Sequence, residues 1–136
     1  MYLLDTTVWI DLLGTNSQSI RRKLSAHSNS VIGLSIIPAC EFRYGLGRRA
    51  ATHPQLRVRE QYLLSAIRAP FDVFPVAHRV VDAYGRSRAA LESFGAGIGA
   101  LDAFIAAQAL SLGATLVTSN TREFATVPGL QIEDWR

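Results

Sequence analysis

The stretch Tyr2-Leu3-Leu4-Asp5-Thr6-Thr7 opens the chain with a short apolar run, an acid and two hydroxyl residues. The apolar run predicts a buried strand, and Thr6 or Thr7 can cap a helix over residues 8–13 that stops at Gly14. Asp5 then stands at the junction between a strand and a helix. In parallel sheets such junctions lie at one edge, where ligands bind.

The rest of the chain repeats this alternation of apolar runs and helical segments. Further strands are predicted at residues 31–34, 71–74, 114–118 and 130–132. Helices are predicted after Ser17, after Ser35 with Pro38 in the first turn, and over residues 54–67, 77–94 and 100–112. The pattern indicates an α/β fold with a mostly parallel central sheet flanked by helices. A chain of 136 residues without repeats or linkers is most simply one domain, residues 1–136.

Composition narrows the class of protein. The chain carries a net charge of +3, and Lys23 is its single lysine among fourteen basic residues. One cysteine, Cys40, excludes an internal disulfide and fits a reducing cytoplasm; its apolar neighbours predict a small core residue. No signal peptide or membrane span is expected. The hydrophobic content of 49% is slightly high, which indicates apolar surface covered by a partner.

Carboxylates and amides stand at the other junctions too. Glu41 lies in the helix after the second strand, Asp102 in the first turn of its helix, and Asn120 and Glu123 after the fourth strand. Acids that gather at one edge repel each other unless a divalent cation sits among them. Oxygen ligands without sulfur or imidazole suit Mg²⁺ or Mn²⁺, which favours phosphodiester chemistry. The alternatives are a helix cap at Asp5, a solvated helix face at Glu41 and a simple turn at residues 120–123.

Four stretches, in a fixed order, resemble one known family. They are Tyr-Leu-Leu-Asp-Thr-Thr at residues 2–7, residues 37–45 around Glu41, Ile-Gly-Ala-Leu-Asp at 98–102, and Leu-Val-Thr-Ser-Asn-Thr-Arg-Glu-Phe at 116–124 with its continuation to Trp135. The chain resembles the PIN-domain ribonucleases of the VapC toxin family, from type II toxin–antitoxin modules. The resemblance implies a single PIN domain with the PIN-like three-layer sandwich.

The resemblance also implies roles for individual residues. Asp5, Glu41 and Asp102 match the family's metal-binding acids, and Asn120 stands where many members have a fourth Asp. Glu123, one turn further on, is expected to restore the missing carboxylate. The implied catalytic residues are Asp5, Glu41, Asp102, Asn120 and Glu123, and all but Asn120 are implied metal ligands. The nearby hydroxyl residues Thr6, Thr118 and Ser119 are expected to contact the substrate.

The function implied is a toxin that acts as an Mg²⁺- or Mn²⁺-dependent endoribonuclease. Its expected substrate is RNA, with the anticodon stem-loop of initiator tRNA as the nearest example, and its expected place is the cytoplasm. One alternative is a PIN-fold module that binds RNA or protein without cutting. Another is a phospho-receiver signalling module, which needs a lysine after the last strand; the only lysine, Lys23, lies far upstream.

The implied partners are a VapB-type antitoxin, in a hetero-oligomer, and a second copy of the chain, in a homodimer. We expect an antitoxin helix to dock in an apolar groove, although the same side chains can equally fill the core. The predicted groove residues are Trp9, Leu12, Leu13, Phe42, Tyr44 and Leu46. Replacing Asp5, Glu41 or Asp102 by Ala is expected to relieve repulsion and to keep or raise the stability of the metal-free protein.

Overall fold

The structure, a computed structural model, describes residues 1–13, 17–52, 71–95 and 97–136. At its centre lies a five-stranded sheet of order β3-β2-β1-β4-β5, and all four described pairings are parallel. The strands are β1 (Tyr2–Leu4), β2 (Ile32–Ser35), β3 (Asp72–Phe74), β4 (Thr115–Val117) and β5 (Ile132–Glu133). The predicted α/β class with a parallel sheet is confirmed.

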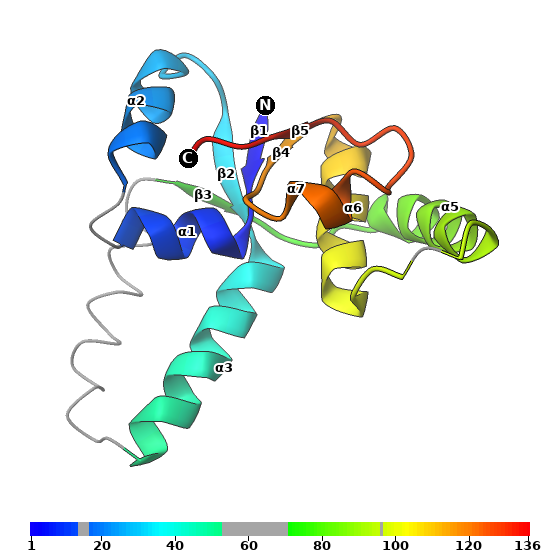
Figure 1. Ribbon diagram of the computed structural model, residues 1–136, viewed down its shortest axis with the longest axis horizontal. Helices are drawn as coiled ribbons and strands as arrows, with labels where there is room; N and C mark the ends of the chain where they lie inside the picture. The colour runs from blue at the N-terminus through cyan, green and yellow to red at the C-terminus, as the bar shows by residue number, and fades with distance from the viewer. Residues whose placement is uncertain (14–16, 53–70, 96) are drawn as a thin grey trace.

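Helices cover both faces of this sheet (Figure 1). They are α1 (Thr6–Leu13), α2 (Gln18–Ala26), α3 (Ile36–Thr52), α5 (Val80–Ser93), α6 (Ala100–Leu112) and the single turn α7 (Thr121–Phe124). The helix predicted at residues 54–67 and the stop at Gly14 lie outside the described residues. No helix within the described ranges is both long enough and apolar enough to span a membrane.

Alternation along β1 explains why two cores form. Leu3 packs with Leu116 and with residues of α5, α6 and α7, whereas Leu4 packs with residues of α1 and α2. Successive side chains of a strand point to opposite faces of its sheet, so one short apolar run serves both layers. Both leucines are fully buried. The central strand is therefore fixed from both sides, and so is the acid that follows it.

Helix α3 differs from the other helices in leaving the body of the protein. It begins at the edge of the sheet and extends away from the strands (Figure 1). Cys40, in its first half, is exposed. The prediction that Cys40 fills the core is wrong, because the apolar residues beside it in sequence lie on other faces of the helix.

Candidate active site

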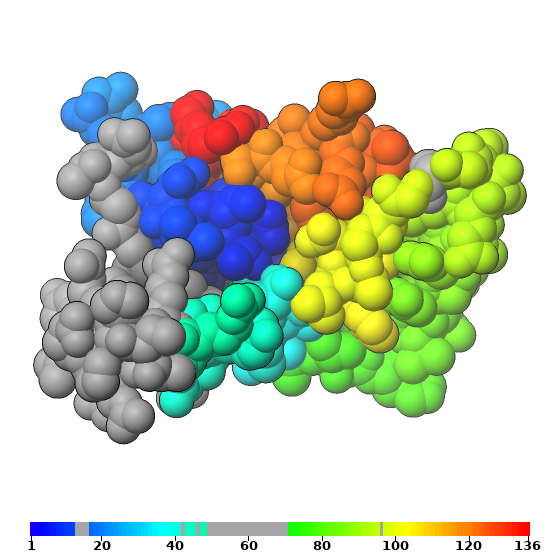
Figure 2. Space-filling view, turned by 60° about the horizontal axis from the view of Figure 1, so that its bottom comes forward, coloured from blue at the N-terminus to red at the C-terminus, as the bar shows by residue number. Residues whose placement is uncertain are grey.

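The predicted site residues meet at the edge where the parallel strands end. Asp5 follows β1, Glu41 lies in the second turn of α3, and Asp102 lies in the first turn of α6. Asn120 stands at the N-cap position of α7, which contains Glu123. We call these five residues the acidic edge. Figure 2 looks onto the face where α1, α3 and α6 come together.

Asp5 is the most firmly held member of the acidic edge. Its side chain is 4% exposed and accepts three hydrogen bonds. The backbone N–H of Thr6 donates to Oδ1 at 2.7 Å, and the hydroxyls of Thr7 and Thr118 donate to Oδ2 at 3.1 and 2.8 Å. A carboxylate offers about four acceptor positions, so with three hydrogen bonds made about one position is left for a ligand. Asp5 is thus a preorganised group that also helps to begin α1.

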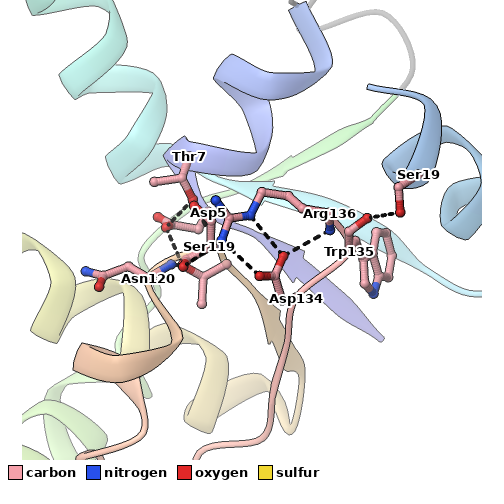
Figure 3. A network of polar contacts seen from close by, with 9 residues as sticks. Asp5, Thr7, Ser19, Ser119, Asn120, Asp134, Trp135 and Arg136 are labelled. Carbon is pink, nitrogen blue, oxygen red and sulfur yellow. Dashed lines mark hydrogen bonds and ion pairs between the residues drawn. The ribbon is translucent and has the colours of Figure 1, made fainter. Parts of the chain in front are cut away.

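The loop after β4 is tied to Asp5 from two sides (Figure 3). The N–H of Ser119 donates to the Thr7 hydroxyl at 3.2 Å, and the N–H of Asn120 donates to the Thr118 hydroxyl at 3.0 Å. On the outside, the Arg136 guanidinium donates to the Ser119 carbonyl at 3.2 Å while it pairs with Asp134. The loop that carries Asn120 is therefore braced against both α1 and the end of the sheet.

Glu41 and Glu123 are held by lighter contacts. The Thr6 hydroxyl donates to Glu41 Oε2 at 3.4 Å, which links α1 to α3. Glu123 accepts from the Asn120 amide at 2.6 Å and from the Gly99 N–H at 3.3 Å. The sequence indicated a turn at residues 120–123, but it did not show that Asn120 holds the neighbouring carboxylate in place.

Asp102 carries the electrostatic signature of the cluster. Its pKa is raised from 3.8 to about 6, first by burial and then by the charges of Glu123, Asp5 and Glu41, in that order. Gly99 makes the close packing possible, because a methyl group there would stand 3.2 Å from Asp102 Oδ2. Two positions that the sequence did not assign to the site, Thr7 and Gly99, therefore shape it. Their only sequence signal is that each lies within three residues of a site acid.

The donor set fits a hard divalent cation. Four carboxylates and one amide can supply oxygen ligands, and after burial the charges of Glu123, Asp5 and Glu41 contribute to the raised pKa of Asp102. In the described part of the chain, no three His, Cys, Asp or Glu side chains are already arranged around one ion position. Glu123 and Asp5 instead accept hydrogen bonds from Asn120, Thr7 and Thr118. Binding an ion thus requires some of these hydrogen bonds to be exchanged for metal contacts.

Asp102 gives a pH-dependent prediction for the metal-free protein. Its folded-state pKa is raised, so its protonated form stabilises the fold fully below pH 3.8, and this stability is lost as pH rises through about 6. Asp102→Asn is therefore expected to melt higher than wild type at pH 7.5 and equally at pH 4. After discounting for solvent screening, the gain is about 1 kcal/mol, or a few degrees. Thermal melting in EDTA at both pH values measures it; an equal offset at the two would contradict it.

A hollow of about 620 Å³ lies elsewhere on the molecule, between α5, the end of α6 and the turn before β5. It is lined by Arg79, Asp82, Arg86, Ser87, Ser111 and Pro128, among others. No residue of the acidic edge lines it. The chemistry expected of the acids belongs to the strand ends and not to this hollow.

The predicted groove residues divide into separate environments. Trp9 is 4% exposed and packs in the core with Leu4, so its assignment to a groove is corrected to the core. Leu12 is partly buried against the same cluster, whereas Tyr44 is exposed on α3. The side chains of Leu13, Phe42 and Leu46 lie outside the described part. A groove made by the other five residues stays a prediction, and so does the homodimer.

Comparison with known proteins identifies the relatives of this arrangement. Residues 2–130 match the model of the PIN domain family. The tRNA(fMet)-specific endonuclease VapC of Salmonella typhimurium is 31% identical over 134 residues, which cover 98% of this chain and 97% of that protein. Ribonuclease VapC2 of Rickettsia felis is 29% identical over 136 residues, 99% and 98% of the two chains.

Solved structures agree with this in fold. VapBC2 from Rickettsia felis, bound to a DNA fragment from its promoter, contains a chain that superposes with a TM-score of 0.89 at 27% identity, covering 99% of this chain and 98% of that one. DNA-bound VapBC from Salmonella typhimurium gives a TM-score of 0.82 at 30% identity, with coverage of 99% and 98%. The match spans the whole sandwich and every segment that contributes to the acidic edge. The chain belongs to the PIN-domain family and, within it, to the VapC ribonucleases of toxin–antitoxin systems.

Proposed function

We propose that this protein is a toxin that cleaves RNA with the help of Mg²⁺ or Mn²⁺. The observation that carries the proposal is the meeting of Asp5, Glu41, Asp102 and Glu123 at one sheet edge, where burial and then the charges of the other three acids raise the pKa of Asp102. Its relatives are named as ribonucleases, and one of them as specific for tRNA(fMet). That RNA is therefore the first substrate to test.

The residues of the acidic edge would have different roles in metal binding and catalysis. Asp5, Glu41, Asp102 and Glu123 would hold the ion, which supplies a Lewis acid for the phosphate and a more acidic water. Asp5 is already oriented by its three donors before any ion binds. Asp102 must lose its proton before it can bind a cation, so metal affinity is expected to fall below about pH 6. Thr6 and Thr118 already donate to acids, which supports a positioning role for both. Thr118 is fully buried, so the prediction that it contacts RNA is wrong, and a contact with RNA stays a prediction for Thr6 and Ser119.

The direct test uses a 5′-labelled tRNA(fMet) transcript. Cleavage at a discrete position in Mg²⁺ or Mn²⁺, and none in EDTA, is expected. Restoration by added metal after EDTA separates a metal requirement from denaturation. A protein that binds the transcript without cutting it in either metal would favour the non-catalytic PIN module instead.

We further propose that the protein assembles with a VapB-type antitoxin. The neighbouring structures are complexes of a toxin with its antitoxin; two of them are bound to DNA, in one case a fragment from their promoter. A short neighbouring reading frame with a DNA-binding N-terminal half and an amphipathic tail is expected to encode the partner. Co-purification of the two products, with loss of RNA cleavage that returns when the partner is removed, is the expected result.

Asn120 and Glu123 are predicted to differ in role. Glu123→Gln keeps the hydrogen bond to the Asn120 amide but removes a charge, so Mn²⁺ binding should weaken about tenfold or more. Asn120→Ala leaves the charge and removes its orienting partner, so turnover should fall more than metal affinity. Calorimetric titration with Mn²⁺ beside RNA cleavage rates checks both. Unchanged Mn²⁺ affinity in Glu123→Gln would remove Glu123 from the metal ligands.

A further inference from the structure

Helix α3 carries an exposed stripe that starts at the acidic edge. Glu41, Tyr44 and Arg48 are spaced three and four residues apart, so their side chains lie on one face of the helix. At a rise of about 1.5 Å per residue, Tyr44 lies about 4.5 Å and Arg48 about 10.5 Å beyond Glu41 along the axis. A strand of RNA leaving the acidic edge along α3 meets Tyr44 first and Arg48 next.

Tyr44 is the unusual member of this stripe. Its side chain is 67% exposed, which places the ring outside the core. The guanidinium carbon of Arg48 stands 5.8 Å from the ring centroid, within the range of a cation–π contact. This contact orders an aromatic ring on the surface and keeps a positive charge beside it.

Two glycines leave space around the ring. Gly45 and Gly47 are exposed, and a methyl group at Gly45 would meet nothing within 4 Å. Glycine weakens an exposed helix relative to alanine, so two of them in one turn are unfavourable for the helix alone. The absent side chain of Gly45 leaves open space next to Tyr44, where a ligand can approach the backbone.

We propose that the stripe of Glu41, Tyr44 and Arg48 is a subsite for an unpaired nucleotide next to the phosphodiester at the acidic edge. Its base stacks on Tyr44, and a neighbouring phosphate pairs with Arg48. The inference rests on the proposed ribonuclease function and deepens it, because it assigns side chains that would contact the RNA strand beside the bond to be cleaved. Bases in a duplex are already stacked on each other and leave the ring without a partner.

The local chemistry favours RNA over a protein at this position. Successive nucleotides in a stacked strand are about 3.4 Å apart, so the first or second nucleotide from the acidic edge reaches Tyr44. Arg48 offers a planar fork that suits phosphate. The contact described for the Tyr44 ring is with the cation of Arg48, which suits a strand that carries phosphates.

Binding of a labelled, unstructured 12-nucleotide RNA tests the subsite in the Asp102→Asn background, where cutting is expected to stop. Tyr44→Ala is expected to weaken binding about 5- to 100-fold, while Tyr44→Phe, which keeps the ring, stays within about twofold. Arg48→Ala should lower the slope of log affinity against log salt by about one. Matched controls are Phe94→Ala, an aromatic that is 77% exposed at the end of α5, and Arg22→Ala on α2; both should bind like the parent.

Two further binding measurements can contradict the subsite: one uses a duplex of the same sequence, and the other uses the cognate antitoxin. Tyr44→Ala is expected to leave duplex binding unchanged. Equal binding of the single strand by Tyr44→Ala and its parent would overturn the subsite. So would a Tyr44→Ala variant that escapes the antitoxin but binds and cuts RNA normally, because the ring would then belong to the protein partner.

Cys40, one turn before Tyr44 and exposed, reports on the same face without any substitution there. Saturating single-stranded RNA is expected to slow its alkylation by iodoacetamide at least fivefold, and an unchanged rate would contradict the subsite. The result is separable from the nuclease proposal. If wild-type protein binds RNA in a Tyr44-dependent way but never cuts it, the subsite is retained and the nuclease proposal is overturned. If the protein cuts RNA but neither binding nor cutting depends on Tyr44, the nuclease proposal is retained and the subsite is overturned.

Discussion

Asp102→Ala is expected to abolish RNA cleavage, with a fall in rate of at least about a thousandfold, while the protein stays folded. The carboxylate lies among three others that raise its pKa, so it is the group whose charge a bound cation would most relieve. Asp5→Ala should be equally inactive. Rates of cleavage of labelled tRNA(fMet) in Mg²⁺ measure both.

The two variants should nevertheless differ in stability. Metal-free Asp102→Ala loses a repelled charge and should melt at or above wild type. Asp5→Ala removes the acceptor of three donors, one of them the fully buried Thr118 hydroxyl, so we expect it to lose about 1–3 kcal/mol. This replaces the expectation, drawn from charge alone, that both hold their stability. Asp82→Ala, an exposed acid on α5, is the matched control, and wild-type cleavage by Asp102→Ala would refute the site.

Gly33→Ala is expected to be the most destabilising small substitution in the sheet. Gly33 is buried in β2 and pairs with Asp72 of β3. An added methyl group would overlap the ring of Phe74 and stand 2.9 Å from the Asp72 carbonyl oxygen. Because the backbone of the neighbouring strand cannot give way easily, we expect a cost of about 3 kcal/mol and a melting temperature lower by about 10 °C.

Two further variants distinguish steric overlap at Gly33 from a general effect of replacing glycine by alanine. At Gly85, in α5, an added methyl group meets nothing within 4 Å, so Gly85→Ala should raise stability by about 0.5–1 kcal/mol. Shortening Phe74 to Leu in the Gly33→Ala protein should recover part of the loss, since the ring is the nearest obstacle. Thermal melting of the four proteins is sufficient. Equal melting of Gly33→Ala and wild type would mean that β3 shifts freely.

Local patterns were enough to predict the strands and the positions of the acids. Leu3 and Leu4 predicted a buried strand, and Asp5 directly after them predicted a group at its edge. The alternation of strands and helices along the chain then predicted a mostly parallel sheet, in which the carboxyl ends of the strands lie at one edge. These features depend on neighbours in sequence, which is why they could be predicted.

Two kinds of feature could not be predicted: contacts between residues distant in sequence, and which side chains of a helix are buried and which are exposed. The Thr118 hydroxyl donates a hydrogen bond to Asp5, 113 residues away in sequence, and no pattern in either segment predicts this contact. Trp9 and Tyr44 are both aromatic residues on helices near the site, yet one is buried and the other exposed. The difference arises because α1 packs on the sheet while α3 extends away from it, and periodicity alone does not show where a helix leaves the body (Figure 1).

The central position of β1 has a consequence for synthesis of the protein on the ribosome. The first strand lies between β2 and β4, so one of its two neighbours is made near the end of translation. At about 5–20 residues per second, roughly 6–23 s separate Asp5 from Thr118. Pairing between such distant segments also makes folding slow. A ribosome-bound chain therefore carries its first acid without the hydroxyl that orients it, and the acidic edge can be complete only when synthesis is nearly finished.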